Sequence, residues 1–433
     1  MVARARYPGC LGTGTGQARP LRILLLTQNF PPEIGAKAAR LHELATRLAA
    51  RGHDVRVITA LPNYPTGMVF EGFRGRLRVE EQLEGVRVIR TWLKPSNSAQ
   101  PFPRLVSYLT FVASSLLLGV RGTGRRDIVF IESPPLFLVL AGLLMGRMAK
   151  ACIVMNVSDI WPETAVRAGL EMRGVPLRLL ERLERLGYEK SDLVTATTQK
   201  ASDSIASRFP KVATAVIPGG TDLELFRPER RSEDLRRSLG IGEADHLVGY
   251  CGLHGLFQGL ETVIGAAEKL RNDPRIKFVL AGDGPTKRTL VEVATAARLD
   301  NVVFMDPMPR EQVGELVASF DVALAPLAAE LPGTMPSKVY ETLACGVPLV
   351  VTEGSEAARL VTDHALGRVV GPLDVDALAG AIADLLDEPA EVNRIRRDAR
   401  RMAQRYDLDE VARGAEATFL ELVGDTVGAP RTY

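Results

Sequence analysis

The feature that most constrains this sequence is a strand–helix–strand pattern close to its start. The apolar run LRILLLT at residues 21–27 predicts a buried strand, and apolar residues recur at helical spacing between residues 38 and 50. Gly52 is placed to end that helix, and DVRVIT at residues 54–59 predicts the next strand. Strands joined through a helix run parallel in one sheet. The chain is therefore expected to start with a β-α-β unit.

The same alternation continues along the chain and falls into two series. The first has expected strands at residues 21–27, 54–59, 86–91, 127–132, 153–157 and 193–195, with helices near 105–120, 136–150 and 176–190. The second has expected strands at 246–251, 277–281, 302–305, 322–326 and 349–352, with helices near 259–271, 285–298, 310–319, 337–345 and 374–387. A chain of 433 residues exceeds the roughly 250–300 at which a single core stops growing. We therefore predict an α/β protein with two doubly wound, Rossmann-like domains.

The expected domain boundaries follow from the two series. Residues 1–20 lack the apolar core of a signal peptide and are interpreted as a disordered leader. Residues 21–213 and 214–405 form the two domains, and residues 406–433 carry a last helix that belongs to the second domain or crosses back to the first. Ligands of such folds bind at the carboxyl edges of the strands. Two such domains facing each other would enclose an interdomain cleft.

Charge is distributed unevenly along the chain, although its net value is only +2. Residues 1–130 hold 19 Lys and Arg against 8 Asp and Glu, so the rest of the chain is acidic. A basic amino-terminal part favours anionic lipid or phosphate as a partner, although solvated surface charge alone also produces this pattern. The apolar stretch at residues 105–120 is too short and too polar for a spanning helix. It is either a buried amphipathic helix or a helix that lies in a membrane surface.

Eight segments, taken in order, resemble one known family. They are PPEIGAKAARL (31–41), RGHDVRVIT (51–59), PNYPTG (62–67), DIWPE (159–163), GGTDLELFRP (219–228), FQGLETV (257–263), AGDGP (281–285) and PSKVYETLACGVPLVV (336–351). Each segment alone is weak evidence. Their order and spacing over residues 21–425 resemble the retaining glycosyltransferases of family 4. The similarity is greatest to the branch that builds bacterial O-antigen, capsule and exopolysaccharide.

The resemblance implies the GT-B fold, with an acceptor domain first and a nucleotide-sugar donor domain second. It also implies a UDP-sugar donor, a lipid-linked saccharide acceptor and retention of the anomeric configuration, without a metal or another cofactor. An enzyme of this kind would be cytoplasmic, or peripheral at the inner face of the plasma membrane. Its expected partners then include an anionic membrane surface and exclude nucleic acid.

The segment PSKVYETLACG predicts the site of the donor diphosphate. Pro336 and Ser337 indicate a helix start, and the unpaired N–H groups of a helix N-terminus bind anions. Lys338 can stabilise the charge on the leaving diphosphate. By the resemblance, Glu341 accepts hydrogen bonds from the donor ribose. The alternative is an ordinary helix start with an ion pair between Lys338 and Glu341.

Two departures from the family pattern affect the donor site. Gly333 stands where relatives carry a first Glu that touches the donor sugar, and the backbone amides from Gly333 through Thr334 to Met335 are candidates to replace it. In GLHGLFQG, neither Leu253 nor Gln258 is basic, although relatives often carry a basic pair there. Gln258 can still donate an amide hydrogen bond, and His254 can bind phosphate if protonated. The alternative for His254 is a loop histidine without a ligand.

The turn AGDGP follows an apolar strand of the second series. Gly282 and Gly284 permit a tight turn beside the expected nucleotide. Asp283 either contributes to that donor site or caps the helix that follows Pro285. The two interpretations of Asp283 remain open.

Three residues of the first domain are candidates for the acceptor and the transferred sugar. Asp159 stands one residue after the position, here Ser158, where relatives carry a His that contacts the sugar near its reacting carbon. Asp159 is therefore the candidate catalytic contact of this domain, with helix capping as its alternative. Glu163 and Gly35 are candidates on the acceptor side. Relatives often have Gly-Gly where this chain has Gly35-Ala36.

A metal site is not expected. DVD at residues 374–376 has the spacing of a metal-binding pair, but it opens a helix, where carboxylates are common. No cluster of His and Cys occurs elsewhere. The four cysteines, Cys10, Cys152, Cys251 and Cys345, form no CxxC pair, which suits a reducing cytosol.

Two other functions remain open at this point. A nucleotide-sugar epimerase can share the double-Rossmann architecture, but it needs acid–base groups and only His254 among the five His is well placed. A catalytically degenerate partner subunit would explain the missing Glu at 333 and the missing basic pair. Donor conversion without acceptor would indicate the first, and failure to bind any nucleotide would indicate the second.

Overall fold

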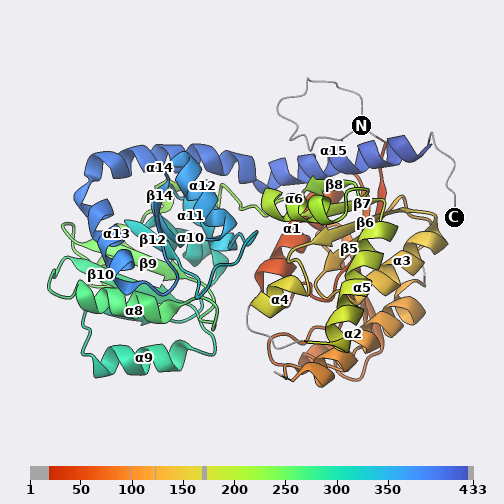
Figure 1. Ribbon diagram of the computed structural model, residues 1–433, viewed down its shortest axis with the longest axis horizontal. Helices are drawn as coiled ribbons and strands as arrows, with labels where there is room; N and C mark the ends of the chain where they lie inside the picture. Colours follow the sequence, from red (N-terminus) through yellow and green to blue (C-terminus); the bar gives the residue numbers. More distant parts are fainter. Residues whose placement is uncertain (1–18, 99, 122, 168–172, 428–433) are drawn as a thin grey trace. The chain divides into compact units, whose positions relative to one another are not determined.

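The computed structural model describes residues 19–98, 100–121, 123–167 and 173–427. The chain divides into two compact units: unit 1 is Met1–Pro218 with Leu408–Tyr433, and unit 2 is Gly219–Asp407 (Figure 1). The expected leader lies outside the described residues as far as residue 18, and so does Cys10. Each unit is an α/β fold around a mainly parallel sheet.

Unit 1 is built on an eight-stranded sheet with the order β3-β4-β2-β1-β5-β6-β7-β8. Its strands are β1 (Arg22–Leu26), β2 (Asp54–Ala60), β3 (Arg78–Leu83), β4 (Val86–Thr91), β5 (Ile128–Ser133), β6 (Cys152–Val157), β7 (Leu193–Ala196) and β8 (Thr214–Val216). All neighbours pair in parallel except β3, which is antiparallel to β4. The central strands are continuous apolar runs because helices cover both of their faces.

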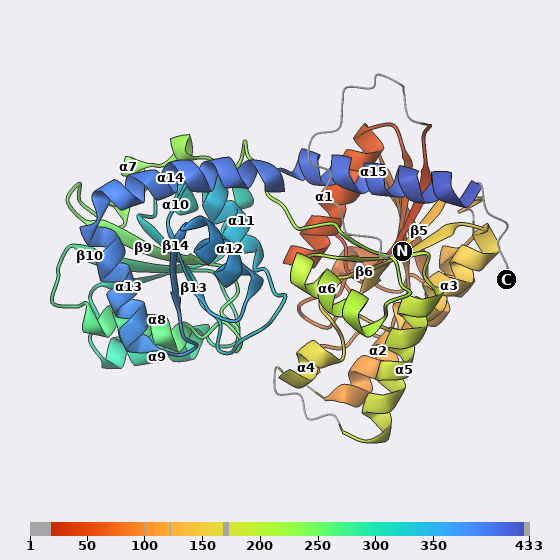
Figure 2. The same ribbon diagram turned by 45° about the horizontal axis from the view of Figure 1, so that its top comes forward.

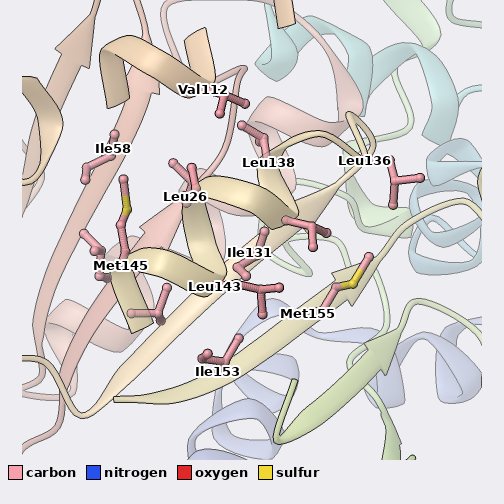
Figure 3. Packing of buried hydrophobic residues seen from close by; sticks show 14 of the residues in the cluster. Leu26, Ile58, Val112, Ile131, Leu136, Leu138, Leu143, Met145, Ile153 and Met155 are labelled. Carbon is pink, nitrogen blue, oxygen red and sulfur yellow. The ribbon is translucent and has the colours of Figure 1, made fainter. Parts of the chain in front are cut away.

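Two layers of helices sandwich the sheet of unit 1 (Figures 1 and 2). The helices are α1 (Ala36–Ala50), α2 (Pro101–Ser114, continuing as a π-helical turn to Gly119), α3 (Leu138–Ala149), α4 (Glu163–Arg167), α5 (Val175–Lys190), α6 (Gln199–Arg208) and α15 (Leu408–Val427), with a 3-10 turn at Glu71–Phe73. Leu24 and Leu26 face the layer of α2, α3, α5 and α6, whereas Ile23 and Leu25 face α1 and α15. This separation follows from the alternation of side chains along a strand. Figure 3 shows the first layer, where Leu138 and Leu143 of α3 lie over Ile131 of β5.

Unit 2 repeats the architecture on a six-stranded, fully parallel sheet. Its order is β11-β10-β9-β12-β13-β14. The strands are β9 (His246–Cys251), β10 (Ile276–Ala281), β11 (Val302–Met305), β12 (Val322–Ala325), β13 (Leu349–Thr352) and β14 (Gly367–Val370). The helices are α7 (Glu233–Ser238), α8 (Leu260–Lys269), α9 (Lys287–Ala296), α10 (Arg310–Ala318), α11 (Ser337–Ala344), α12 (Glu356–His364), α13 (Val375–Asp387) and α14 (Pro389–Ala403), with 3-10 turns at Pro228–Arg230 and Gln404–Tyr406. Helices α8, α9 and α13 cover one face, and α10, α11, α12 and α14 cover the other.

The boundary between the units differs from the expected one. Strand β8 pairs with β7, so residues 214–218 belong to unit 1 and the expected boundary at residue 213 is too early. Helix α15 packs in unit 1, where Ala415 and Phe419 are buried in the core around β1. Elements that the sequence did not predict are strands β3, β8 and β14 and helices α4, α6, α7, α12 and α14.

The stretch expected as a single helix at residues 105–120 begins earlier, at Pro101, and ends at Gly119. Contrary to the expectation from the sequence, this helix is long and apolar enough to cross a membrane by length and composition alone, and it is the one such helix among the described residues. One such helix is weak evidence for a span, because core helices of soluble proteins meet the same criteria. Its inner side packs in the core through Phe111 and Val112.

Candidate functional site

The loops after the parallel strands gather at the carboxyl edge of each sheet. In unit 2 these loops are residues 252–259 after β9, 282–286 after β10 and 326–336 after β12. In unit 1 they follow β1, β5 and β6. Most of the residues singled out in the sequence lie in these loops or in the first turn of the helix that follows. The two groups are described separately.

Lys338 is held against an aromatic ring in unit 2. It stands in the first turn of α11, and its Nζ lies 3.6 Å from the centroid of the Tyr250 ring at the end of β9. The Tyr250 hydroxyl donates to the carbonyl of Leu253 at 2.6 Å, which fixes the ring. Burial lowers the pKa of Lys338 to about 7, while Cys251 and Glu341 act in the opposite direction. Lys338 is therefore a cation whose charge is sensitive to what binds beside it.

Glu341 follows Lys338 by one turn of α11 and is half-buried. Burial raises the pKa of this carboxyl group, and the nearby charges of Arg310 and Lys338 oppose the shift. Arg310 opens α10 and lies over the ring of Phe226 at 5.8 Å. The helix start that the sequence predicted therefore carries a cation and a carboxylate next to each other. Pro336 precedes it without a side-chain cap.

The glycines of AGDGP bring two loops together. A Cβ at Gly282 would lie 1.9 Å from the carbonyl oxygen of Gly252, and one at Gly284 would lie 2.3 Å from that of His254. Both glycines also have positive φ angles, which side chains disfavour. The backbones of the two loops therefore touch, and any larger residue would separate them. The expected tight turn is present at this edge of the sheet.

Asp283 does not cap the next helix, so that alternative is wrong. Helix α9 begins only at Lys287, after Thr286. The Asp283 carboxylate is exposed and accepts a hydrogen bond from the N–H of Gly284 at 2.8 Å. It closes its own turn instead. Its contact with a donor remains a prediction.

The expected role of a protonated His254 is wrong. Its side chain is fully buried, and burial lowers its pKa to about 4, helped by the charges of Lys287 and Lys338. The imidazole is therefore neutral near pH 7 and does not add a positive charge for a phosphate. The epimerase alternative relied on this histidine as an accessible acid–base group, and its side chain is fully buried. Gln258, in the same loop, is half-buried with its side-chain oxygen folded over Gly255.

The segment from Gly333 to Met335 is only partly available as a replacement for the missing carboxylate. The N–H of Thr334 donates to the carbonyl of Leu331 at 3.1 Å, so this amide is used within its own turn. The Thr334 carbonyl accepts from the N–H of Glu356 at 3.1 Å. Gly333 adopts a φ of 80°, which favours glycine. The Thr334 amide is therefore already bonded within its own turn, and the role of this segment at the donor sugar remains a prediction.

A buried carboxylate organises the corresponding edge of unit 1. Glu132, near the end of β5, is 0% exposed. The Nη2 of Arg40 donates to both of its oxygens at 2.9 Å and to Ser158 Oγ at 2.8 Å. The Ser158 hydroxyl donates to Glu132, and Asn156 Nδ2 donates to it at 2.8 Å. We call Arg40, Glu132, Asn156 and Ser158 the Glu132 network.

Lys37 and Asp159 lie beside the Glu132 network. The Nζ of Lys37, in the first turn of α1, donates to the Pro134 carbonyl at 2.8 Å. Burial raises the pKa of Asp159, and the charge of Lys37 is the largest opposing influence. Burial lowers the pKa of Lys37, with Glu132 and Asp159 opposing that shift. The structure therefore places Asp159 in a cluster of charged groups, and not at a helix cap.

The two acceptor-side candidates have different settings. Gly35 is exposed and precedes α1 in an extended conformation, with a φ of 166°. Glu163 opens α4, and its carboxylate lies 3.7 Å from the guanidinium of Arg208. Neither observation tests a contact with an acceptor. The Ser158 hydroxyl, at the position of the family's His, is hydrogen-bonded within the Glu132 network.

Several residues of these clusters were missed by sequence reasoning. Lys37 and Arg40 lie within PPEIGAKAARL at i, i+3 spacing, and Glu132 interrupts the apolar strand IVFIES. An acid inside a buried strand is a usable signal, because it needs partners. Nothing in the sequence connects Tyr250 to Lys338 or Arg310 to Glu341. These pairings are set by the sheet order.

The DVD segment is explained by helix capping. Asp374 accepts a hydrogen bond from the N–H of Ala377 at 2.9 Å at the start of α13, and Asp376 lies 2.6 Å from Lys269. Within the described ranges, no group of three or more His, Cys, Asp or Glu side chains is arranged to hold a metal ion. The helix-start interpretation of DVD is confirmed.

Comparison with known proteins agrees with this arrangement. The family model "Glycosyl transferase 4-like domain" matches residues 35–220, and "Glycosyl transferases group 1" matches residues 231–402. The chain is 27% identical over 380 residues to the putative colanic acid biosynthesis glycosyl transferase WcaI of Escherichia coli K12, which covers 84% of this chain and 92% of that protein.

Solved structures show the same fold. The sucrose-phosphate synthase of Thermosynechococcus elongatus superposes with a TM-score of 0.75 at 19% identity, covering 93% of this chain and 99% of that one. Anabaena Alr3699/HepE, in complex with UDP and glucose, superposes with a TM-score of 0.66 at 19% identity, covering 95% and 100%. At these identities the likeness concerns the fold alone.

Proposed function

Because this chain belongs to glycosyltransferase family 4 and has the GT-B fold, we propose that it moves a sugar from UDP to an acceptor hydroxyl with retention of configuration. The observation that carries the proposal is the start of α11, where Lys338 and Glu341 stand one turn apart beside the loops after β9 and β10. A cation, a carboxylate and unpaired helix N–H groups suit a nucleoside diphosphate.

In the proposed reaction the bond between the anomeric carbon and the diphosphate oxygen breaks. Its electron pair stays on the diphosphate, whose charge rises in the transition state. Lys338 and the N-terminus of α11 stabilise that charge. The acceptor oxygen attacks the same face of the sugar, and its proton passes to the departing phosphate oxygen. Glu341 holds the ribose and fixes the donor's position.

The finer identities are supported by the relatives. HepE is described in complex with UDP and glucose, which supports a UDP-sugar. WcaI is named for colanic acid biosynthesis, which supports cell-surface polysaccharide as the product class. We therefore propose a lipid-linked saccharide acceptor on the cytoplasmic side of the plasma membrane. Asp159 and Lys37 of unit 1 are the proposed contacts for the transferred sugar and the acceptor.

The role of Glu341 can be tested by calorimetry with UDP. Glu341→Gln keeps the shape of the side chain and removes its charge, so UDP binding should weaken by about 1.5–3 kcal/mol. Glu243→Gln, at an exposed loop position of the same unit, is the control and should bind as the wild type does. Unchanged UDP affinity in a folded Glu341→Gln variant would remove Glu341 from the ribose role. Failure of the wild type to bind any nucleotide would contradict the proposed function.

We also propose that transfer needs no divalent cation. The support is that the carboxylate pair singled out in the sequence, Asp374 and Asp376, is engaged in a helix cap and an ion pair. Turnover of UDP-sugar should therefore continue at the same rate in excess EDTA. Loss of turnover in EDTA, followed by recovery with Mg²⁺ or Mn²⁺, is the contrary result.

A further inference from the structure

Apart from Arg147 in its last turn, helix α3 is apolar on every side, although one side faces outward. Its inner side packs closely on the sheet, because a Cβ at Gly142 would lie 2.2 Å from the Ile131 side chain and one at Gly146 would lie 2.4 Å from that of Ile153. Its outer side carries three residues at four-residue spacing, 41–62% exposed: Leu140, Leu144 and Met148. A helix that is apolar all round is normally covered by protein or lipid. In the described part of the chain, nothing covers this side.

Helix α2 and its π-helical extension continue the same apolar surface. The ring of Tyr108 stacks on Phe137, next to the start of α3, with 6.0 Å between the ring centroids. The outer side of α2 carries three large apolar residues that are 43–73% exposed: Phe102, Leu109 and Leu117. Only 33% of the most apolar window of this helix is buried. These six exposed residues of the two helices are called the α2–α3 face, which lies on the layer of unit 1 opposite α15 (Figures 1 and 2).

The charged residues within the two helices of the α2–α3 face have one sign. Neither helix contains Asp or Glu. Five exposed basic residues lie in the two helices or directly after them: Arg104, Arg121, Arg125, Arg147 and Lys150. A hollow of about 400 Å³ at one end of the face is lined by Gly124, Arg125, Met148, Ala149 and Lys150. Two cations beside an apolar side chain suit the phosphate of a lipid headgroup.

We infer that the α2–α3 face docks unit 1 on the surface of an anionic lipid bilayer. The exposed apolar side chains enter the boundary between headgroups and acyl chains, and the basic side chains meet the lipid phosphates. The positive charge of the two helices favours a bilayer over a second copy of the chain as the partner of this face. A self-complementary interface would bring the basic residues of the two helices against those of the second copy. The inference rests on the proposed function only in supposing a membrane-held acceptor, since binding to lipid requires neither donor nor acceptor.

The test is co-sedimentation of the full chain with vesicles. Vesicles of phosphatidylcholine with about a third phosphatidylglycerol should retain the protein at low salt and release much of it at high salt. Vesicles of phosphatidylcholine alone should retain far less. Equal retention on both vesicle types would overturn the charge-dependent docking.

Two double variants address the apolar and the basic part of the face. Leu117→Glu with Leu144→Glu should lower vesicle binding by at least about tenfold, because it places carboxylates at the lipid boundary. Arg125→Glu with Lys150→Glu should give a similar loss and abolish the dependence on salt. All four positions are exposed, so the fold should be retained. A thermal shift with UDP, which should be the same in every variant, checks this directly.

Matched controls come from α9 of unit 2. Val293→Glu changes an apolar residue that is 50% exposed, and Arg288→Glu changes an exposed arginine, so the double control has the same chemistry outside the face. It should bind vesicles as the wild type does. Equal loss in the control and the face variants would overturn the assignment of the face. A wild-type dimer in sedimentation velocity that dissociates with Leu117→Glu and Leu144→Glu would show a contact between copies instead.

Discussion

Lys338 combines a positive charge with surroundings that weaken it. The half-buried ammonium lies on the Tyr250 ring, and burial brings its pKa down to about 7. A cation–π contact favours the charged form, but the loss of hydration opposes it more strongly. A dianionic ligand beside Nζ favours the charged form. The charge of Lys338 is therefore strongest when a diphosphate, and above all a departing one, is present.

Substitution of Lys338 should consequently affect turnover more than donor binding. Lys338→Met keeps the stem and removes the charge, so kcat should fall by roughly 10²–10³, as for the loss of one strong oxyanion donor, with a smaller change in donor affinity. Lys338→Arg should recover only part of the loss, because a planar guanidinium does not replace a compact ammonium. The measurement is steady-state transfer to a saccharide acceptor. A kcat within about threefold of the wild type would place the phosphate contact elsewhere.

The pH profile separates a charge effect from a structural one. The ammonium of the free enzyme loses its proton as the pH rises through about 7, so kcat/KM should fall on the alkaline side from that point. Lys338→Arg stays charged throughout and should lack this alkaline fall, whatever its maximum rate. An unchanged alkaline fall in Lys338→Arg would assign the titration to another group.

Residue-level prediction from the sequence worked where a motif fixed local geometry. Lys338 and Glu341 lie at the predicted helix start because Pro336 sets it. Prediction from the sequence failed where the burial of a side chain determines its protonation state. His254 lies in the predicted loop, but its side chain is buried, and a sequence does not reveal how far a loop is covered by its neighbours. The sequence left Asp283 either as a donor contact or as a helix cap. The structure excludes the helix cap, because α9 begins only at Lys287.

At the level of elements, the apolar runs identified the strands that helices cover on both faces. Strands β1, β5 and β6 consist mainly of apolar residues, and such runs can be recognised from the sequence alone. The missed elements have weak patterns. Strand β3 (RVEEQL) lies at the sheet edge, β8 has three residues, and α6 (QKASDSIASR) buries only Ala201, Ser202 and Ile205. Their formation depends on pairing or docking with elements distant in the sequence.

The Glu132 network also depends on residues that are distant in the sequence, so its hydrogen bonds could not be predicted from the sequence. A carboxylate near the end of a buried strand can be recognised as unusual, because its burial is costly without partners. Its partners come from α1 and from the end of β6, which adjoin β5 only through the sheet order. Several hydrogen bonds that converge on one buried carboxylate fix the side chains that make them. It therefore holds the start of α1, with Lys37, against the end of β6, where Asp159 follows.

At the scale of the whole molecule, the chain leaves unit 1 after Pro218, builds unit 2 and returns as α15. The returning helix is tied to unit 1 by polar and apolar contacts. Glu416 lies 2.9 Å from Nε2 of His53, whose Nδ1 accepts from the N–H of Leu21 at 3.0 Å. Phe419 is buried edge-to-face against Phe130 of β5, with 5.9 Å between the ring centroids. The last segment of the chain is therefore part of the core that contains β1 and β5.

This arrangement predicts that damage to α15 weakens unit 1 and spares unit 2. Phe419→Ala should cost about 3–5 kcal/mol of stability in unit 1, because it leaves a cavity beside Phe130. Hydrogen exchange followed by mass spectrometry should then show faster exchange in β1 and β5 and unchanged exchange in β9 and β10. Saturating UDP, at about 100 times its Kd, should protect unit 2 by about 2.7 kcal/mol in wild type and variant alike.

The matched control is Phe320→Ala, a buried phenylalanine of unit 2 against Gly249, which should speed exchange in β9 and leave β1 unchanged. Faster exchange in β9 and β10 on Phe419→Ala would mean that the two units unfold together, and α15 would then stabilise the whole chain and not unit 1 alone.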